Sequence, residues 1–269
     1  LLDNGLRFAD DSLFSSVVQT SSGDCPIWVG WDIISTLGDR LKSISSSKQA
    51  FIICDDGTKR FAELAERSIQ DSGISVEVIS IPPGETSKTL QVASDLYEWL
   101  GSFHAERNNP VIAVGGGVVG DISGFVAATY LRGMPFVQVP TSMLAMMDAS
   151  IGGKTAVDMP HGKNLVGSFH QPEFVLVDVK TLIHLPKRHL SAGWAEAIKH
   201  GFILDEQLVS DFERNATALM SLERDITTEI VKRSIAIKSE IVSMDENETL
   251  GKRILLNYGH TIGHAIEFA

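Results

Sequence analysis

The sequence predicts an α/β protein that has a parallel sheet in its first part and helices alone in its second. Apolar runs alternate with segments of helical periodicity between residues 49 and 178, which is typical of parallel strands joined by right-handed crossovers. A glycine-rich turn at residues 115–120 connects one apolar run to a helix, as in Rossmann-like nucleotide-binding folds. From residue 187 onward only helical periodicity is found. We therefore expect an α/β domain at residues 1–186 and an α-helical domain at 187–269.

The elements of the α/β part follow one another in a regular order. Short β-like runs come first, and strands and helices then alternate, with apolar residues at helical spacing between the strands. The expected strands are residues 16–20, 27–29, 49–54, 76–81, 111–114, 136–140 and 175–178. The expected helices are 61–72, 90–100 and 118–129, and in the second part 189–204, 207–219, 222–242 and 250–269.

Composition limits what the protein can do. The 269 residues are 43% hydrophobic, enough for one large or two modest domains with a proper core. The sequence lacks an apolar run of about 20 residues and a signal-peptide pattern, so we expect a soluble cytoplasmic protein. A net charge of −11 argues against nucleic acid or an anionic membrane as a partner. Cys25 and Cys54 have no metal-binding spacing, which favours buried thiols.

The glycine turn is a candidate phosphate site. Glycines allow the backbone to approach a phosphate, and the N–H groups at the start of a helix attract an anion. The nearest acid is Asp121, whereas a ribose-binding carboxylate normally lies about 20 residues further on. Tight packing of helix on strand also explains such glycines. Polar residues beside later glycines favour the ligand site, because ligands of open sheets bind past the strand ends. These residues are Asp148, Lys154, Lys163 and Asn164.

Two groups in the helical part carry further chemistry. Glu196, Lys199 and His200 have the spacing of one helix face, either as a site or as an exposed, salt-bridged surface. His260 and His264 lie one turn apart, the spacing of metal-binding helices, without the glutamate of a protease motif. Glu196 provides a carboxylate, so the residues make a metal site plausible without defining one.

Five motifs in order resemble those of the 3-dehydroquinate synthase family, one of the sugar phosphate cyclases. They are GGGVVGD at 115–121, DASIGGKT at 148–155, GKNL at 162–165, AGWAEAIK at 192–199 and NYGHTIGH at 257–264. The resemblance covers nearly the whole chain. It implies a lyase that uses NAD and a divalent metal, zinc or cobalt, to convert 3-deoxy-D-arabino-heptulosonate 7-phosphate into 3-dehydroquinate and phosphate in the shikimate pathway.

The resemblance also implies residue roles. For NAD, it implies contacts from Asp55, Glu85, Lys88, Gly116, Gly117, Val118, Asp121, Thr141, Ser142, Asp148, Lys154, Lys163, Thr181 and Leu182. For the substrate, it implies Arg132, Lys154, Asn164, Lys199, Lys238, Arg253, Asn257 and His264, with Arg132 reaching the other subunit of a homodimer. For the metal, it implies Glu196 and His260, and the family's third ligand falls beyond Ala269.

Three alternatives stay open from the sequence. Other cyclases of this fold act on different sugar phosphates, and polyol dehydrogenases share the glycine turn and the metal. Because the third metal ligand is absent and the sequence stops within a helical pattern at residues 266–269, we also expect that the chain is a C-terminally incomplete piece. Such a piece would bind NAD and be inactive.

Overall fold

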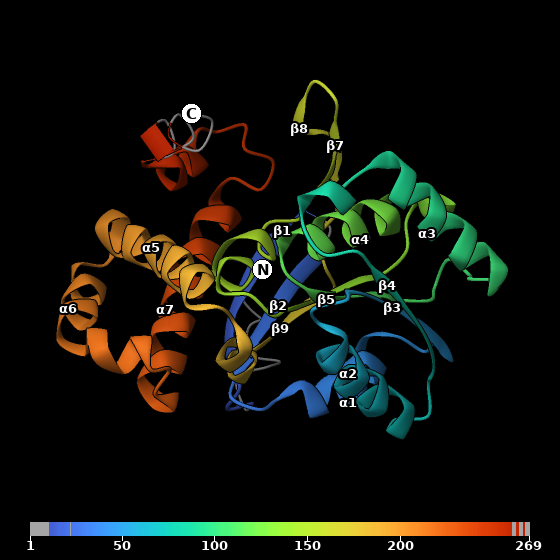
Figure 1. Ribbon diagram of the computed structural model, residues 1–269, viewed down its shortest axis with the longest axis horizontal. Helices are drawn as coiled ribbons and strands as arrows, with labels where there is room; N and C mark the ends of the chain where they lie inside the picture. The colour runs from blue at the N-terminus through green and yellow to red at the C-terminus, as the bar shows by residue number, and fades with distance from the viewer. Residues whose placement is uncertain (1–10, 22, 260–261, 264–265, 267–269) are drawn as a thin grey trace.

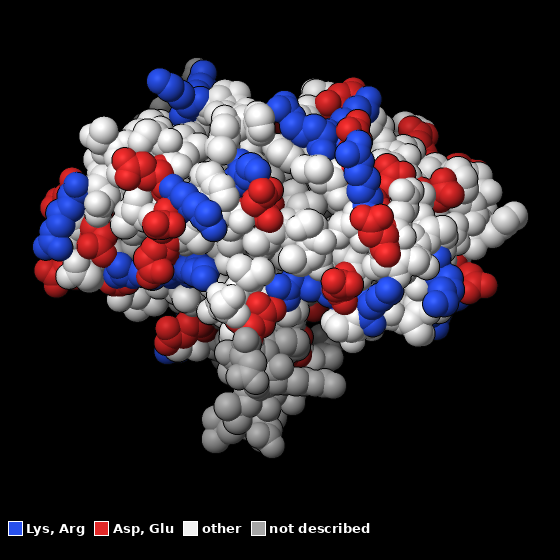
Figure 2. Space-filling view, turned by 90° about the horizontal axis from the view of Figure 1, so that it is seen from below, with Lys and Arg blue, Asp and Glu red and all other residues white. Residues whose placement is uncertain are grey.

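The computed structural model describes the chain except for residues 1–10, 22, 260–261, 264–265 and 267–269. The α/β part and the helical part lie side by side, with the sheet running through the first of them (Figure 1). None of the helices in the described ranges combines the length and apolar character needed to cross a bilayer. On the face drawn in Figure 2, basic and acidic side chains of the described residues are interspersed.

The main sheet has seven strands in the order β1-β2-β9-β6-β5-β3-β4. All neighbouring pairs are parallel except β1 with β2, which are antiparallel at one edge. The predicted parallel sheet is therefore confirmed, with an antiparallel edge added. The strands are β1 Phe14–Thr20, β2 Gly23–Gly30, β3 Gln49–Asp55, β4 Ser75–Ile81, β5 Val111–Gly115, β6 Phe136–Pro140 and β9 Phe174–Asp178.

Helices cover both faces of this sheet, so its central strands are apolar on both sides. On β3, Ile52 packs toward α1 (Leu37–Ile44) and α2 (Lys59–Asp71). The neighbouring Ile53 packs toward α3 (Leu90–Ser102) and α4 (Gly117–Thr129). Successive side chains of a strand point to opposite faces, which places these neighbours in two different cores.

The helical part consists of α5 (Lys187–Leu204), α6 (Glu206–Met220) and α7 (Arg224–Met244), as predicted. These helices pack on β1, β2 and β9 in one continuous core, in which Val177 of the sheet joins Trp194 and Ile230 of the helices. The domain boundary predicted near residue 186 stays a prediction, because a core shared by the two parts is compatible with one domain or with two.

The continuous helix predicted from residue 250 is wrong up to residue 259, whereas the described residues beyond it, Ile262, Gly263 and Ile266, are helical. A 3-10 helix, η7, occupies Lys252–Asn257 and is followed by a turn. Gly251 and Gly259 on either side have φ of 72° and 83°, in the left-handed region that ends a right-handed helix. The apolar periodicity of the segment did not reveal these two interruptions.

A two-stranded antiparallel hairpin was not predicted. It is formed by β7 (Lys154–Met159) and β8 (Gly162–Phe169) and projects from the α/β part (Figure 1). Lys154, Lys163 and Asn164 belong to this hairpin, so placing them past the ends of the parallel strands was wrong. Of the predicted polar residues, Asp148 does follow β6, in a short π-helix, η5 (Ala145–Ala149).

Candidate active site

A cleft of about 400 Å³ lies where α4, η5, the hairpin, α7 and η7 meet. Side chains from segments more than 100 residues apart in the sequence line it together. The lining residues are Asp121, Asp148, Ala149, Ile151, Lys154, Asn164, Lys238, Glu248, Arg253, Leu256 and Asn257. Seven of them were predicted from the sequence, namely Asp121, Asp148, Lys154, Asn164, Lys238, Arg253 and Asn257.

The predicted glycine turn lies between β5 and α4, close to this cleft. At Gly115 a side chain is excluded, because a Cβ there would lie 2.7 Å from Val119 Cβ. At Gly117 a Cβ would lie 3.4 Å from Ala149 Cβ, so α4 begins close to the cleft wall. The N–H of Thr141 donates to Gly115 O over 2.9 Å and brings the segment after β6 beside the turn. The turn therefore exposes the start of α4, where anions bind favourably.

Beside this turn, a buried lysine ties three elements together. Lys88, only 4% exposed, donates from Nζ to the carboxylate of Asp121 and to the side-chain oxygen of Asn164. Burial raises the pKa of Asp121 to about 6 in spite of Lys88. Asn164 has a left-handed φ of 58°, and its N–H donates to Asp158 Oδ1 over 2.8 Å. Lys88 thus fixes the hairpin against α4.

A second buried lysine closes the cleft from α7. Lys238 donates to both the carboxylate and the backbone oxygen of Asp148. Burial raises the pKa of Asp148, but the charge of Lys238, with Lys199 and His200, outweighs it and holds the pKa at about 2. Burial lowers the pKa of Lys238 itself. The pair joins η5 to the helical part.

The predicted face of α5 is real, and it is buried rather than exposed. Lys199 donates to Glu196 and, over 2.6 Å, to Leu256 O. His200 is fully buried, with Nδ1 2.6 Å from Ser234 Oγ. Burial, reinforced by Lys238 and Lys199, lowers the pKa of His200 to about 4. The reading of these residues as an exposed salt-bridged surface is therefore wrong.

The same face offers donors of the kind a divalent metal uses. Among the described residues His200 Nε2 has no hydrogen-bond partner, and it lies 3.7 Å from Glu196 Oε1, so a carboxylate adjoins an imidazole nitrogen. Such donors suit zinc or cobalt. His260 and His264 lie outside the described residues, and within the described ranges no group of three or more possible ligands forms. The donors present fit a metal at Glu196 without completing its coordination.

The other predicted residues lie outside the cleft lining. Asp55, at the end of β3, accepts a hydrogen bond from Thr58 over 3.0 Å, and Lys163 Nζ lies 3.9 Å from Glu85 Oε1 on the exposed side of the hairpin. Some of the rest surround the glycine turn or are buried near β9. They are Gly116, Val118, Ser142, Thr181 and Leu182. Arg132 is exposed, with a φ of 66°, and does not line the cleft.

Sequence reasoning missed two acids of the loop between α7 and η7. Glu248 pairs with Lys154 across the cleft, and Asp245 is buried beneath the loop. The only signal was an acidic segment before Gly251, which is more often a solvated turn. Glu248 meets Lys154 only through the tertiary fold, and the contacts of Asp245 within its own loop depend on the path of that loop, so a single sequence does not show either.

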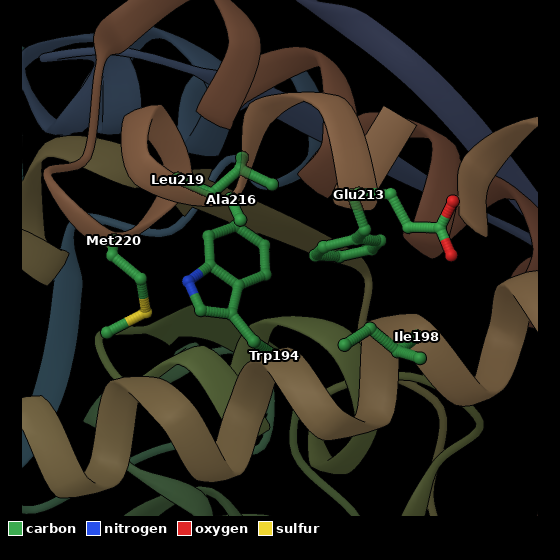
Figure 3. A pocket seen from close by; sticks show the side chains of 7 residues that line it. Trp194, Ile198, Glu213, Ala216, Leu219 and Met220 are labelled. Carbon is green, nitrogen blue, oxygen red and sulfur yellow. The ribbon is translucent and has the colours of Figure 1, made fainter. Parts of the chain in front are cut away.

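A separate pocket of about 280 Å³ lies between α5 and α6. Figure 3 shows the Trp194 ring between the two helices, with Met220 and Glu213 at opposite ends of the pocket. Its lining is otherwise apolar, with Ile198 and Leu219 among the residues. A charged ligand needs converging polar groups, so the cleft is the better candidate site.

The fold and the cleft define a class of protein, an α/β sheet with a glycine turn beside a cleft where three basic side chains converge among three acids, which suits a small polar, anionic ligand. Residues 78–192 match the 3-dehydroquinate synthase N-terminal family and residues 193–269 the 3-dehydroquinate synthase C-terminal family. A relative named 3-dehydroquinate synthase, from Symbiobacterium thermophilum, is 45% identical over 91% of this chain and 68% of its own length. The chain belongs to the 3-dehydroquinate synthase family.

Solved structures of other cyclases share the fold. A 2-deoxy-scyllo-inosose synthase complexed with carbaglucose-6-phosphate, NAD+ and Co2+ has a TM-score of 0.83 and 27% identity, over 94% of this chain and 69% of that one. A 2-epi-5-epi-valiolone synthase from Streptomyces hygroscopicus subsp. jinggangensis 5008, with NAD+ and Zn2+ bound, has a TM-score of 0.79 and 25% identity, over 88% of this chain and 66% of that one. The predicted α/β fold with a helical second part is confirmed.

Proposed function

We propose that the chain carries the active site of a 3-dehydroquinate synthase, which converts 3-deoxy-D-arabino-heptulosonate 7-phosphate into 3-dehydroquinate and phosphate. The observation that carries the proposal is the convergence of Lys154, Lys238 and Arg253 from three separate segments in one cleft. The substrate has a phosphate and a carboxylate, and charge-assisted hydrogen bonds from such cations suit both groups. The 45% identity to a relative of that name supports the same reaction.

Within this proposal, different residues of the cleft bind different groups of the substrate. Lys154, Asn164 and Asn257 orient the phosphate, together with His264. Arg253 and Lys238 hold the carboxylate and hydroxyl groups. A substrate held in this way is oriented for elimination and ring closure, which contributes a large part of such rate enhancements. Lys199 lies beside Glu196, close to the carbon that is oxidised. The predicted contribution of Arg132 belongs to a homodimer, which is part of the proposal, as is the cytoplasmic location.

The cofactors follow from the same residues. NAD binds with its pyrophosphate at the start of α4, and Glu196 and His260 hold a divalent metal. When bound, the metal polarises the oxygen on the carbon that is oxidised. Two similar cyclases have NAD+ with Co2+ or Zn2+ bound, which supports both assignments. The Nε2 atom of His200, which lies beside Glu196 and has no hydrogen-bond partner in the described part of the chain, supports the position of the metal.

The test measures phosphate and NADH together, with zinc and NAD present. We expect phosphate to appear with turnover while the NADH absorbance stays flat, because a cyclase regenerates its cofactor. Stoichiometric NADH would instead indicate a polyol dehydrogenase, and neither product would indicate an inactive NAD-binding piece. Lys154→Gln should lower kcat/KM by about tenfold to 100-fold, the usual worth of a charged hydrogen bond. Lys59→Gln, which removes a surface pair with Asp56, is the control.

A further inference from the structure

The loop between α7 and η7 is organised by a single buried carboxylate. Asp245 is 2% exposed. Its Oδ1 accepts the N–H groups of Thr249 and Leu250 over 2.8 and 2.9 Å. Its Oδ2 accepts those of Lys252 and Arg253 over 2.9 and 3.4 Å. Four backbone donors of one loop therefore converge on one side chain.

The loop held in this way presents two charged side chains to the cleft. Glu248, with a left-handed φ of 56°, pairs with Lys154 of the hairpin. Arg253 is 3% exposed and donates from Nη1 to Glu246 O over 2.9 Å. On its other side lies Gly152, where a Cβ would be 2.7 Å from Arg253 Nη2. The guanidinium thus has one position, and it depends on the path of the loop.

We propose that Asp245 is a positioning residue, which acts through the loop backbone to place Arg253 for the anionic substrate. This inference rests on the proposed function. Asp245 does not line the cleft, so it acts without touching the substrate. Since one of its four hydrogen bonds comes from the backbone of Arg253, its loss displaces the start of η7 itself.

The chemistry of the site requires a carboxylate rather than an amide. Burial raises the pKa of Asp245, but the hydrogen bonds from the loop N–H groups outweigh it and lower the pKa, so the residue is charged at neutral pH. In Asp245→Asn one oxygen still accepts, while the NH2 group faces N–H donors with which it cannot bond. At least two of the four hydrogen bonds should then be lost.

The first experiment compares substrate kinetics in the full chain. Asp245→Asn should raise KM for the heptulosonate phosphate by about tenfold to 100-fold, the usual worth of a charge-assisted hydrogen bond such as one from Arg253. Its affinity for NAD should stay within about twofold, because the glycine turn lies on the other side of the cleft. The control is Asp205→Asn, which removes the charge paired with Arg233, away from the cleft, and keeps an oxygen that caps Leu208 N–H. It should lower thermal stability with KM unchanged.

A double-mutant cycle separates positioning from general destabilisation. If Asp245 acts through Arg253, the effects of Asp245→Asn and Arg253→Lys on KM should be far from additive. Additive effects, or a KM change in Asp205→Asn equal to that in Asp245→Asn, would overturn the inference.

Hydrogen exchange gives a readout that does not need activity. The amides of residues 249–253 should exchange at least about tenfold faster in Asp245→Asn than in the unchanged chain, because their acceptor is lost. Equal exchange in both proteins would overturn the inference whatever the enzyme does. A chain that lacks synthase activity but shows the exchange difference would refute the proposed function alone.

Discussion

Replacing Asp121 by asparagine should stabilise the ligand-free protein at neutral pH. Asp121 lies in the second turn of α4, paired with Lys88, and burial raises its pKa from 3.8 to about 6. Between these values the folded protein keeps a proton that the unfolded chain has released. Stability therefore falls as the pH rises across this window.

The magnitude follows from the size of the shift. A rise from 3.8 to about 6 corresponds to about 3 kcal/mol at 1.36 kcal/mol per pKa unit. Asparagine does not ionise, so the variant avoids this cost and still offers an oxygen to Lys88. At pH 7 we expect the free energy of unfolding of Asp121→Asn to exceed that of the unchanged protein by up to about 3 kcal/mol. The two free energies should converge below about pH 4.

The assay is urea unfolding of both proteins between about pH 4 and about pH 7. Asp56→Asn is a control of opposite sign, because hydrogen bonds from Lys59 and Ser80 lower the pKa of Asp56. That variant should be less stable than the unchanged protein near neutral pH, with the difference lost as the pH falls. If Asp121→Asn is no more stable than the unchanged protein at pH 7, the ionised Asp121 carries no burial penalty and the reasoning fails.

Three further substitutions have clear expected results. Gly193→Ala places a Cβ 2.2 Å from Met143 Cγ and should destabilise the protein by about 1–3 kcal/mol through overpacking; an unchanged Tm would contradict the close approach of α5. Gly117→Val should weaken NAD binding by about 2 kcal/mol, and equal affinity in calorimetry would exclude the glycine turn as the site. Glu248→Gln removes the acid paired with Lys154, so inorganic phosphate should bind about tenfold more tightly. Weaker phosphate binding would show that Glu248 does not compete with phosphate for Lys154.

The regular helices and strands could be predicted because the spacing of their apolar residues indicates which side chains are buried. The strands β5 and β6 are continuous apolar runs buried throughout, and α7 has a stripe of isoleucines facing the core. The hairpin gave no such signal, since β8 is exposed along nearly its whole length. It is held instead by tertiary hydrogen bonds, such as that from the N–H of Asp158 to Lys88 O over 2.7 Å.

The site was predicted in part for a similar reason. Motif residues such as Lys154 and Asn257 were identified by type and order, and the fold brings them into one cleft. Their partners were not, because Glu248 and Asp245 act through contacts that depend on the path of a loop. The burial of the α5 face at His200 likewise depends on α7 packing over it.

Three lysines around the cleft already hold carboxylates before a ligand arrives. The pairs are Lys88 with Asp121, Lys238 with Asp148 and Lys154 with Glu248. Opposite charges in contact cancel beyond a few ångströms, so this group of lysines projects little attraction into solvent. An arriving anion gains most of its electrostatic energy only at contact, by exchanging places with a carboxylate. The association rate of the anion should therefore vary little with ionic strength. An uncharged analogue of the same shape should bind poorly, because it cannot replace the carboxylates and leaves the three ion pairs intact.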